Sequence, residues 1–218
     1  AHSQAVSGTT PKDTTAPQIL AVNPASGSTF GPQQTIKIYA GDDAALAGVT
    51  VEYRAAGSAD TWCMLAQETV SGTSDSVTVA LGGAQLPDGA YDLRMFVRDE
   101  AGNQSAYTEV SYTLDATPPA VPAVQAGADG DTVTVTWSSQ AEDDLAGFYI
   151  YRVTADGAST RIGSVSAAGG QQTYTFADAL HWSLCGQPYT YRVTAIDRYG
   201  NTASASSAQV TPEAEADT

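Results

Sequence analysis

The chain has few of the residues that most often build a catalytic or redox site. Its 218 residues include two cysteines and two histidines. Cys63 and Cys185 lie in different halves, so neither half can close an internal disulfide, and no Cys-x-x-Cys spacing for a metal or haem exists. Neither His2 nor His181 belongs to a Ser–His–Asp signature, and no Gly-x-Ser-x-Gly sequence occurs. We therefore expect no enzymatic activity.

Positive charge is also scarce. Nine Lys and Arg residues stand against 24 Asp and Glu, which gives a formal net charge of −15. So few basic side chains cannot line a groove for a polyanion, and an acidic chain repels phosphate and anionic membrane surfaces. The sequence has no apolar run long enough to span a bilayer. We therefore expect neither nucleic-acid binding nor membrane insertion.

Three motifs occur twice in this chain, in the same order and about 100 residues apart. The matching segments are 13–17 with 115–119, 43–48 with 143–147, and 99–103 with 197–201. A repeat of this size predicts two tandem domains. We place them at residues 16–116 and 117–212, between a tail or linker at 1–15 and an acidic tail at 213–218.

Short runs of alternating apolar residues fill both repeats, separated by Gly, Asn, Asp and Ser. In the first repeat they predict strands that include Ile19–Val22, Thr35–Ala40 and Thr108–Leu114. In the second repeat, Val133 and Val135 share one face of a strand. About seven short strands in a unit of this size indicate an immunoglobulin-like sandwich.

The second repeat resembles the fibronectin type III family over about residues 118–212. Trp137 matches the buried tryptophan of that family, and Leu184 precedes Tyr189 as in its tyrosine corner. The first repeat, about 16–114, resembles bacterial immunoglobulin-like modules, which lack the tryptophan. We therefore expect an all-β fold class with two tandem immunoglobulin-like (fibronectin type III-like) β-sandwiches. Both families imply an extracellular or cell-surface location and a role in spacing, display or adhesion.

Acidic side chains gather in three loops that this topology brings to one pole of each domain. The loops are the start of the domain and the connections after its second and sixth strands. Ca²⁺ prefers six to eight oxygen ligands, so it is the one cofactor that the pattern suggests. The candidate ligands are Asp13, Asp42, Asp43, Asp99 and Asn103 in the first repeat, and Asp115, Asp143, Asp144, Asp197 and Asn201 in a second site at the domain junction.

Turn chemistry explains the same residues without a metal. In Asp-x-x-Gly-Asn the aspartate caps main-chain amides while the glycine takes a positive φ, and Asp-x-x-x-Pro can be a rigid linker. The sequence leaves both explanations open. Among the aromatic residues, we expect Trp182, flanked by Leu180 and Leu184, to close the bottom of the second sandwich.

Two functions remain after these exclusions. The first is a non-catalytic extracellular spacer or interaction module of a secreted or surface bacterial protein. The second is a structural subunit of a surface assembly, such as a filament, lattice, adhesin stalk or phage decoration, held by ordered tails. The expected partners are other proteins or identical subunits, with polysaccharide as a further candidate, and the sequence names no specific ligand.

Overall fold

The computed structural model describes residues 11–81 and 86–214. The chain divides into two compact units, Ala1–Asp115 and Ala116–Thr218. The boundary expected from the repeat lies one residue later, after residue 116. The assembly role that we considered for the chain ends rests mainly on residues 1–10 and 215–218, which lie outside the described residues.

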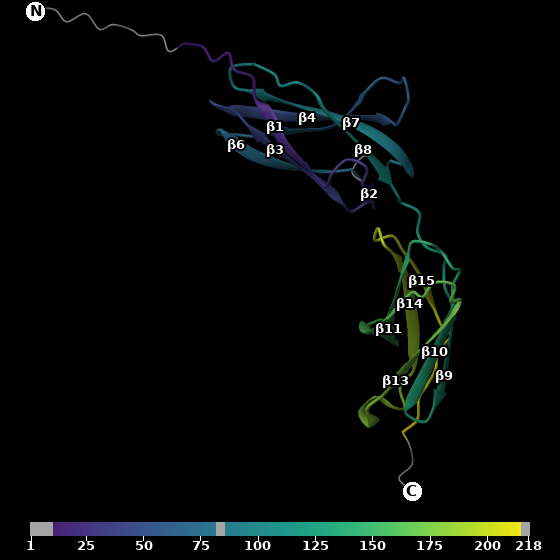
Figure 1. Ribbon diagram of the computed structural model, residues 1–218. Coiled ribbons are helices and arrows are strands. Elements are labelled where there is room, and N and C mark those ends of the chain that lie inside the picture. Colours follow the sequence, from purple (N-terminus) through teal and green to yellow (C-terminus); the bar gives the residue numbers. More distant parts are fainter. Residues whose placement is uncertain (1–10, 82–85, 215–218) are drawn as a thin grey trace, which may run out of the picture. The chain divides into compact units, whose positions relative to one another are not determined.

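The first unit contains two β-sheets (Figure 1). One has the order β1-β3-β6, with strands at Gln18–Asn23, Thr35–Gly41 and Ser74–Ala80. The other has the order β2-β8-β7-β4-β5, with strands at Thr29–Phe30, Thr108–Leu114, Gly89–Asp99, Leu46–Ala55 and Cys63–Thr69. The three strands quoted for this repeat from the sequence are confirmed. Strand β5 was not predicted, because none of its side chains is buried and it shows no alternation.

The second unit repeats the two-sheet arrangement. The smaller sheet has the order β13-β10-β9, with strands at Thr173–Ala179, Thr132–Ser138 and Ala123–Asp129. The larger has the order β12-β11-β14-β15, with strands at Ser159–Ser166, Leu145–Thr154, Tyr189–Asp197 and Thr202–Ser206. A 3₁₀ helix, η2 at Trp182–Leu184, precedes β14.

Alternation along the strands places the core of the second unit between its two sheets. Trp137 on β10 is 1% exposed, as expected from the sequence. Its indole stacks on the ring of Tyr174 with a centroid separation of 5.8 Å, and it meets the edge of Phe148 at 5.3 Å. Three large rings in contact fill the space that an aliphatic core would need more residues to fill.

A tyrosine hydroxyl fixes the loop that leads into strand β7 of the first unit and into strand β14 of the second. The Tyr189 hydroxyl donates to the carbonyl oxygen of Leu184 at 2.9 Å, which confirms the predicted tyrosine corner. In the first unit the Tyr91 hydroxyl donates to the carbonyl oxygen of Pro87 at 2.8 Å. The same device therefore occurs in both units, although only the second resembled the fibronectin family closely in sequence.

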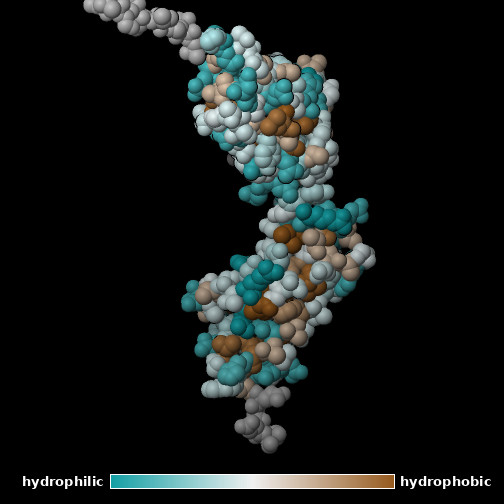
Figure 2. Space-filling view, turned by 60° about the vertical axis from the view of Figure 1, so that its left-hand side comes forward, coloured by the Kyte–Doolittle hydropathy of each residue, from teal (hydrophilic) through white to brown (hydrophobic). Residues whose placement is uncertain are grey.

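The expectation that Trp182 closes the second sandwich is wrong. Trp182 is 73% exposed, whereas Leu180, two residues earlier, is 4% exposed and joins the core. Trp182 belongs to the short helix η2, which buries none of its residues, so the Trp182 ring points away from the sandwich. Elsewhere, hydrophilic and weakly polar residues cover most of the surface visible in Figure 2, and apolar residues form small patches.

The thiols of both cysteines are free, with Cys63 exposed and Cys185 half-buried. This agrees with the absence of an internal disulfide in either repeat. In residues 11–81 and 86–214, no helix is long and apolar enough to cross a membrane.

Candidate metal centre

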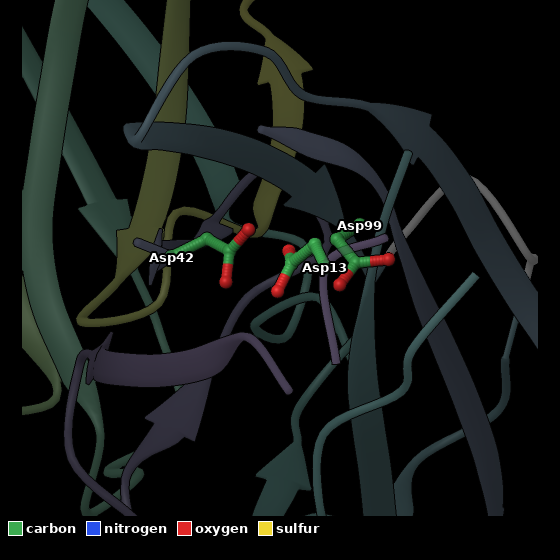
Figure 3. Close-up of side chains that lie close together, drawn as sticks. All are labelled: Asp13, Asp42 and Asp99. Carbon is green, nitrogen blue, oxygen red and sulfur yellow. The ribbon is translucent and has the colours of Figure 1, made fainter. Parts of the chain in front are cut away.

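Three strand ends bring aspartates together in the first unit. Asp13 precedes β1, Asp42 directly follows β3, and Asp99 is the last residue of β7. One carboxylate oxygen from each residue lies within 4.8 Å of the others. Figure 3 shows the side chain of Asp13 between those of Asp42 and Asp99. Residues distant in sequence therefore form one acidic group.

The turn after β7 holds Asp99 in place. Asn103 donates to Asp99 twice, from its main-chain N–H to Oδ1 at 2.7 Å and from Nδ2 to Oδ2 at 2.6 Å. Gly102 supplies the positive φ of +92° that this tight turn requires. Asp99 is 3% exposed, and burial alone would raise its pKa, but the hydrogen bonds from Asn103 and the turn amides outweigh burial and lower the pKa.

The second unit builds the same turn after β14. Oδ1 of Asp197 accepts from the main-chain N–H groups of Tyr199 at 2.8 Å and Asn201 at 2.9 Å, and Oδ2 accepts from Asn201 Nδ2 at 2.8 Å. Gly200 has a φ of +90°. The capping turn expected from the sequence is thus present in both units. It does not exclude a cation, because a carboxylate oxygen can accept more than one interaction.

Main-chain hydrogen bonds hold the neighbouring loop against this turn in each unit. Glu100 N donates to the carbonyl oxygen of Ala45 at 2.8 Å, and Arg198 N donates to that of Asp144 at 2.9 Å. These bonds fix the distance between the two acidic loops within each unit.

Only one aspartate of each adjacent pair joins its group. Asp42 belongs to the group of the first unit, while Asp43 is exposed and outside it. In the second unit Asp144 has a carboxylate oxygen within 4.8 Å of one from Asp197, while Asp143 is exposed and outside the group. The pairs sit differently, since Asp42 follows a strand and Asp144 precedes one.

The predicted junction site is divided between the units. Asp115 is the last residue of the first unit, where its N–H donates to the carbonyl oxygen of Phe30 at 2.8 Å. Within the second unit the structure brings Asp144 and Asn201 to Asp197. Of the two acidic groups, only that of Asp13, Asp42 and Asp99 takes all three of its aspartates from a single unit.

Sequence reasoning missed a stack of arginines and aromatic rings in the first unit. The guanidinium groups of Arg54 and Arg94 lie 4.3 and 4.6 Å from the centroid of the Trp62 ring. Arg94 also lies 4.6 Å from the Tyr107 ring and pairs with Glu52 at 2.6 Å. The alternation of β7 was the available signal, because Leu93 and Met95 point inward and so place Arg94 on the outer face.

No family model matches the chain. Exoglucanase B of Cellulomonas fimi is 35% identical over 215 residues. The match covers 91% of this chain and 17% of that protein. The chain thus spans less than a fifth of the length of this relative.

Solved structures show the fold. The FN1–FN3 domains of chicken CNTN1 match with a TM-score of 0.55 and 16% identity, covering 91% of this chain and 66% of theirs. The fibronectin(III)-like modules of Clostridium thermocellum CbhA match with a TM-score of 0.48 and 16% identity, covering 93% and 98%. The first likeness confirms the expected fold of tandem immunoglobulin-like, fibronectin type III-like β-sandwiches.

Proposed function

We propose that this chain is a non-catalytic extracellular spacer or interaction module of a larger secreted or surface protein. The alignment with Exoglucanase B carries the proposal. It takes in almost the whole chain, with both units, yet only 17% of the relative, an enzyme by its name. A module of this size beside a much larger remainder fits a part that positions a catalytic region rather than one that performs the reaction.

The arrangement of the described side chains supports a non-catalytic role. His181 is the one histidine within residues 11–81 and 86–214, and it lies on an exposed loop. Its Nδ1 is 2.9 Å from the Ser183 hydroxyl, and none of the ion pairs among residues 11–81 and 86–214 holds the ring against a carboxylate that would orient it as a base. A fold of this kind carries chemistry only through a site added to it, so the function has to be argued from the site and not from the fold.

The proposed partners are other proteins, identical subunits or polysaccharide. Trp182 at 73% exposure and Met64 at 65% are the most exposed members of their residue types in the described chain. An exposed indole can lie flat on a sugar ring, whereas a thioether cannot. Substitution of each side chain therefore distinguishes binding to polysaccharide from non-specific hydrophobic adhesion.

The purified 218-residue chain provides the test. Incubated with soluble and insoluble glucans, it is expected to release no new reducing ends. Hydrolysis that increases with the amount of chain and is lost in His181→Ala would overturn the proposal. In a cellulose pelleting assay, binding that is lost in Trp182→Ala and kept in Met64→Ala would identify polysaccharide as a partner. Sedimentation velocity showing growth into polymers with concentration would favour the structural-subunit alternative.

A further inference from the structure

The acidic group of the first unit has more carboxylate oxygens than its turns use. Oδ1 of Asp13 accepts from the N–H of Thr15 at 2.9 Å, and Oδ2 of Asp42 accepts from the N–H of Ala44 at 3.3 Å. Each of these residues thereby satisfies one oxygen within its own loop. Turn chemistry accounts for these two oxygens and leaves one on each residue.

The two remaining oxygens, Asp13 Oδ2 and Asp42 Oδ1, are shielded from solvent without a hydrogen-bond partner. Each exposes less than 1 Å². A buried polar atom without a partner costs about 1–3 kcal/mol, and a charged one costs more. None of the ion pairs found in the described part of the chain includes Asp13, Asp42 or Asp99. Among the described residues, these two oxygens therefore have no cationic side chain as a partner.

One ion can contact all three residues, because one carboxylate oxygen from each lies within 4.8 Å of the others. Ca²⁺ takes six to eight oxygen ligands in a flexible geometry, and carboxylates and main-chain carbonyls are its usual ligands in proteins. Mg²⁺ demands a near-ideal octahedron and keeps several of its waters, so three carboxylates on separate segments of the chain suit Ca²⁺ better.

The group also draws in the start of the unit. We define the leading segment as residues 11–17, which precede β1 and contain no strand. This segment contributes the Asp13 side chain to the group. In addition, the main-chain carbonyl oxygen of Asp13 accepts a hydrogen bond from Asn103 Nδ2 at 3.3 Å. Asp42 directly follows β3 and Asp99 is the last residue of β7, so both are held in place by a sheet. Asp13 is the one member of the group on a segment without sheet hydrogen bonds.

We propose that Asp13, Asp42 and Asp99 bind one Ca²⁺ ion, which fastens the leading segment to the loops after β3 and β7. With the ion bound, the two shielded oxygens gain a cationic partner and the carboxylates no longer repel one another. Without it, separation of Asp13 from the other two carboxylates relieves the repulsion, so the leading segment detaches more often. This proposal does not depend on the function proposed above.

The two lysines of the chain make the fastening measurable. Lys12 is exposed on the leading segment, whereas Lys37 lies in the middle of β3, between β1 and β6. Endoproteinase Lys-C cleaves after lysine and needs no calcium. Cleavage after Lys12 releases residues 1–12 and reports detachment of the leading segment, while cleavage after Lys37 reports unfolding of the sheet.

The experiment compares Lys-C cleavage of the full chain in CaCl₂ and in chelator, together with a calorimetric titration with CaCl₂. At a calcium concentration ten times the dissociation constant, release of residues 1–12 should slow about tenfold, because only the attached form binds the ion. Cleavage after Lys37 serves as the reference for global unfolding. MgCl₂ at the same concentration should protect Lys12 less.

Two neighbouring aspartates provide matched variants. Asp42→Asn removes one charge from the group and should abolish calcium protection of Lys12, while Asp43→Asn removes a charge beside the group and should keep it. Equal cleavage at Lys12 with and without calcium in the parent chain would overturn the proposal. Protection that persists in Asp42→Asn would overturn the ligand assignment. Heat of binding without protection of Lys12 would show an ion elsewhere and would overturn the fastening.

Discussion

The buried hydroxyl of Tyr191 is expected to stabilise the second unit more than the hydroxyl of a neighbouring tyrosine does. Tyr191 is fully buried on β14, and its O–H donates to Oδ2 of Asp178 on β13 at 2.8 Å. Arg152 on β11 donates to the same carboxylate at 2.9 and 3.2 Å. These bonds join strands from the two sheets of the sandwich. Burial and the nearby carboxylate raise the pKa of Tyr191, so its hydroxyl stays protonated and remains a donor.

The substitution Tyr191→Phe removes this donor without changing the ring. A hydrogen bond to a charged acceptor contributes about 1.5–3 kcal/mol, so we expect a loss of about 2 kcal/mol in the free energy of unfolding. For a unit of roughly 100 residues this corresponds to a fall in Tm of about 8–16 °C. Tyr189→Phe removes a hydroxyl that donates to a neutral carbonyl, and it should cost only about 1 kcal/mol.

The assay is urea denaturation of the full chain, followed by hydrogen exchange of peptides from β10 and β14. These peptides report the second unit separately from the first. The expected order of stability is parent, then Tyr189→Phe, then Tyr191→Phe. If Tyr191→Phe loses no more stability than Tyr189→Phe, the charged acceptor adds nothing and the reasoning fails.

Three further predictions concern strained, titrating and reactive positions. Gly147→Ala should lower the free energy of unfolding by about 1–3 kcal/mol, because the φ of Gly147 is +159° and a Cβ there would lie 2.5 Å from the carbonyl oxygen of Val165. Gly48→Ala, where the nearest atom would lie 3.3 Å away, should lower it less in the same urea denaturation. Since the folded-state pKa of Asp99 is lowered, its contribution to stability is present above the unfolded pKa of about 3.9 and is lost as the pH falls through the folded value. The free energies of unfolding of the parent and of Asp99→Asn, measured between about pH 2 and 5, should therefore converge toward low pH. A constant difference across this range would contradict the prediction. In a thiol titration of the native chain, exposed Cys63 should react faster than half-buried Cys185, and equal rates in the absence of denaturant would contradict their difference in burial.

Local periodicity determined much of the fold. A strand alternates its side chains with a period of two, so the apolar positions of β3, β8 and β10 could be recognised without knowing their neighbours. The repeat indicated that this pattern occurs twice, and the resemblance to the fibronectin type III family implied a buried ring for Trp137. Strand β5 was missed for the same reason, since an edge strand with exposed side chains carries no alternation.

The acidic group could be predicted only in part. The motifs placed aspartates on three loops, and the shared topology indicated that these loops meet at one end of the unit. Which member of the pair Asp42–Asp43 joins Asp99 was decided by the path of the loop after β3, because adjacent residues there point in different directions. The shielding of single carboxylate oxygens likewise depends on atoms from several loops at once.

The sequence by itself determined the alternating strands and the capping turns, because each depends on residues close together in the chain. It also determined the tandem repeat, because the two copies of each motif can be compared directly. Only the tertiary structure decided that Asp42 rather than Asp43 joins the acidic group, that Arg94 stacks on Trp62, and that the Trp182 ring faces outward. Each of these depends on where a loop leads after it leaves its strand. Loop paths are determined by packing against the whole unit, so no short-range pattern encodes them.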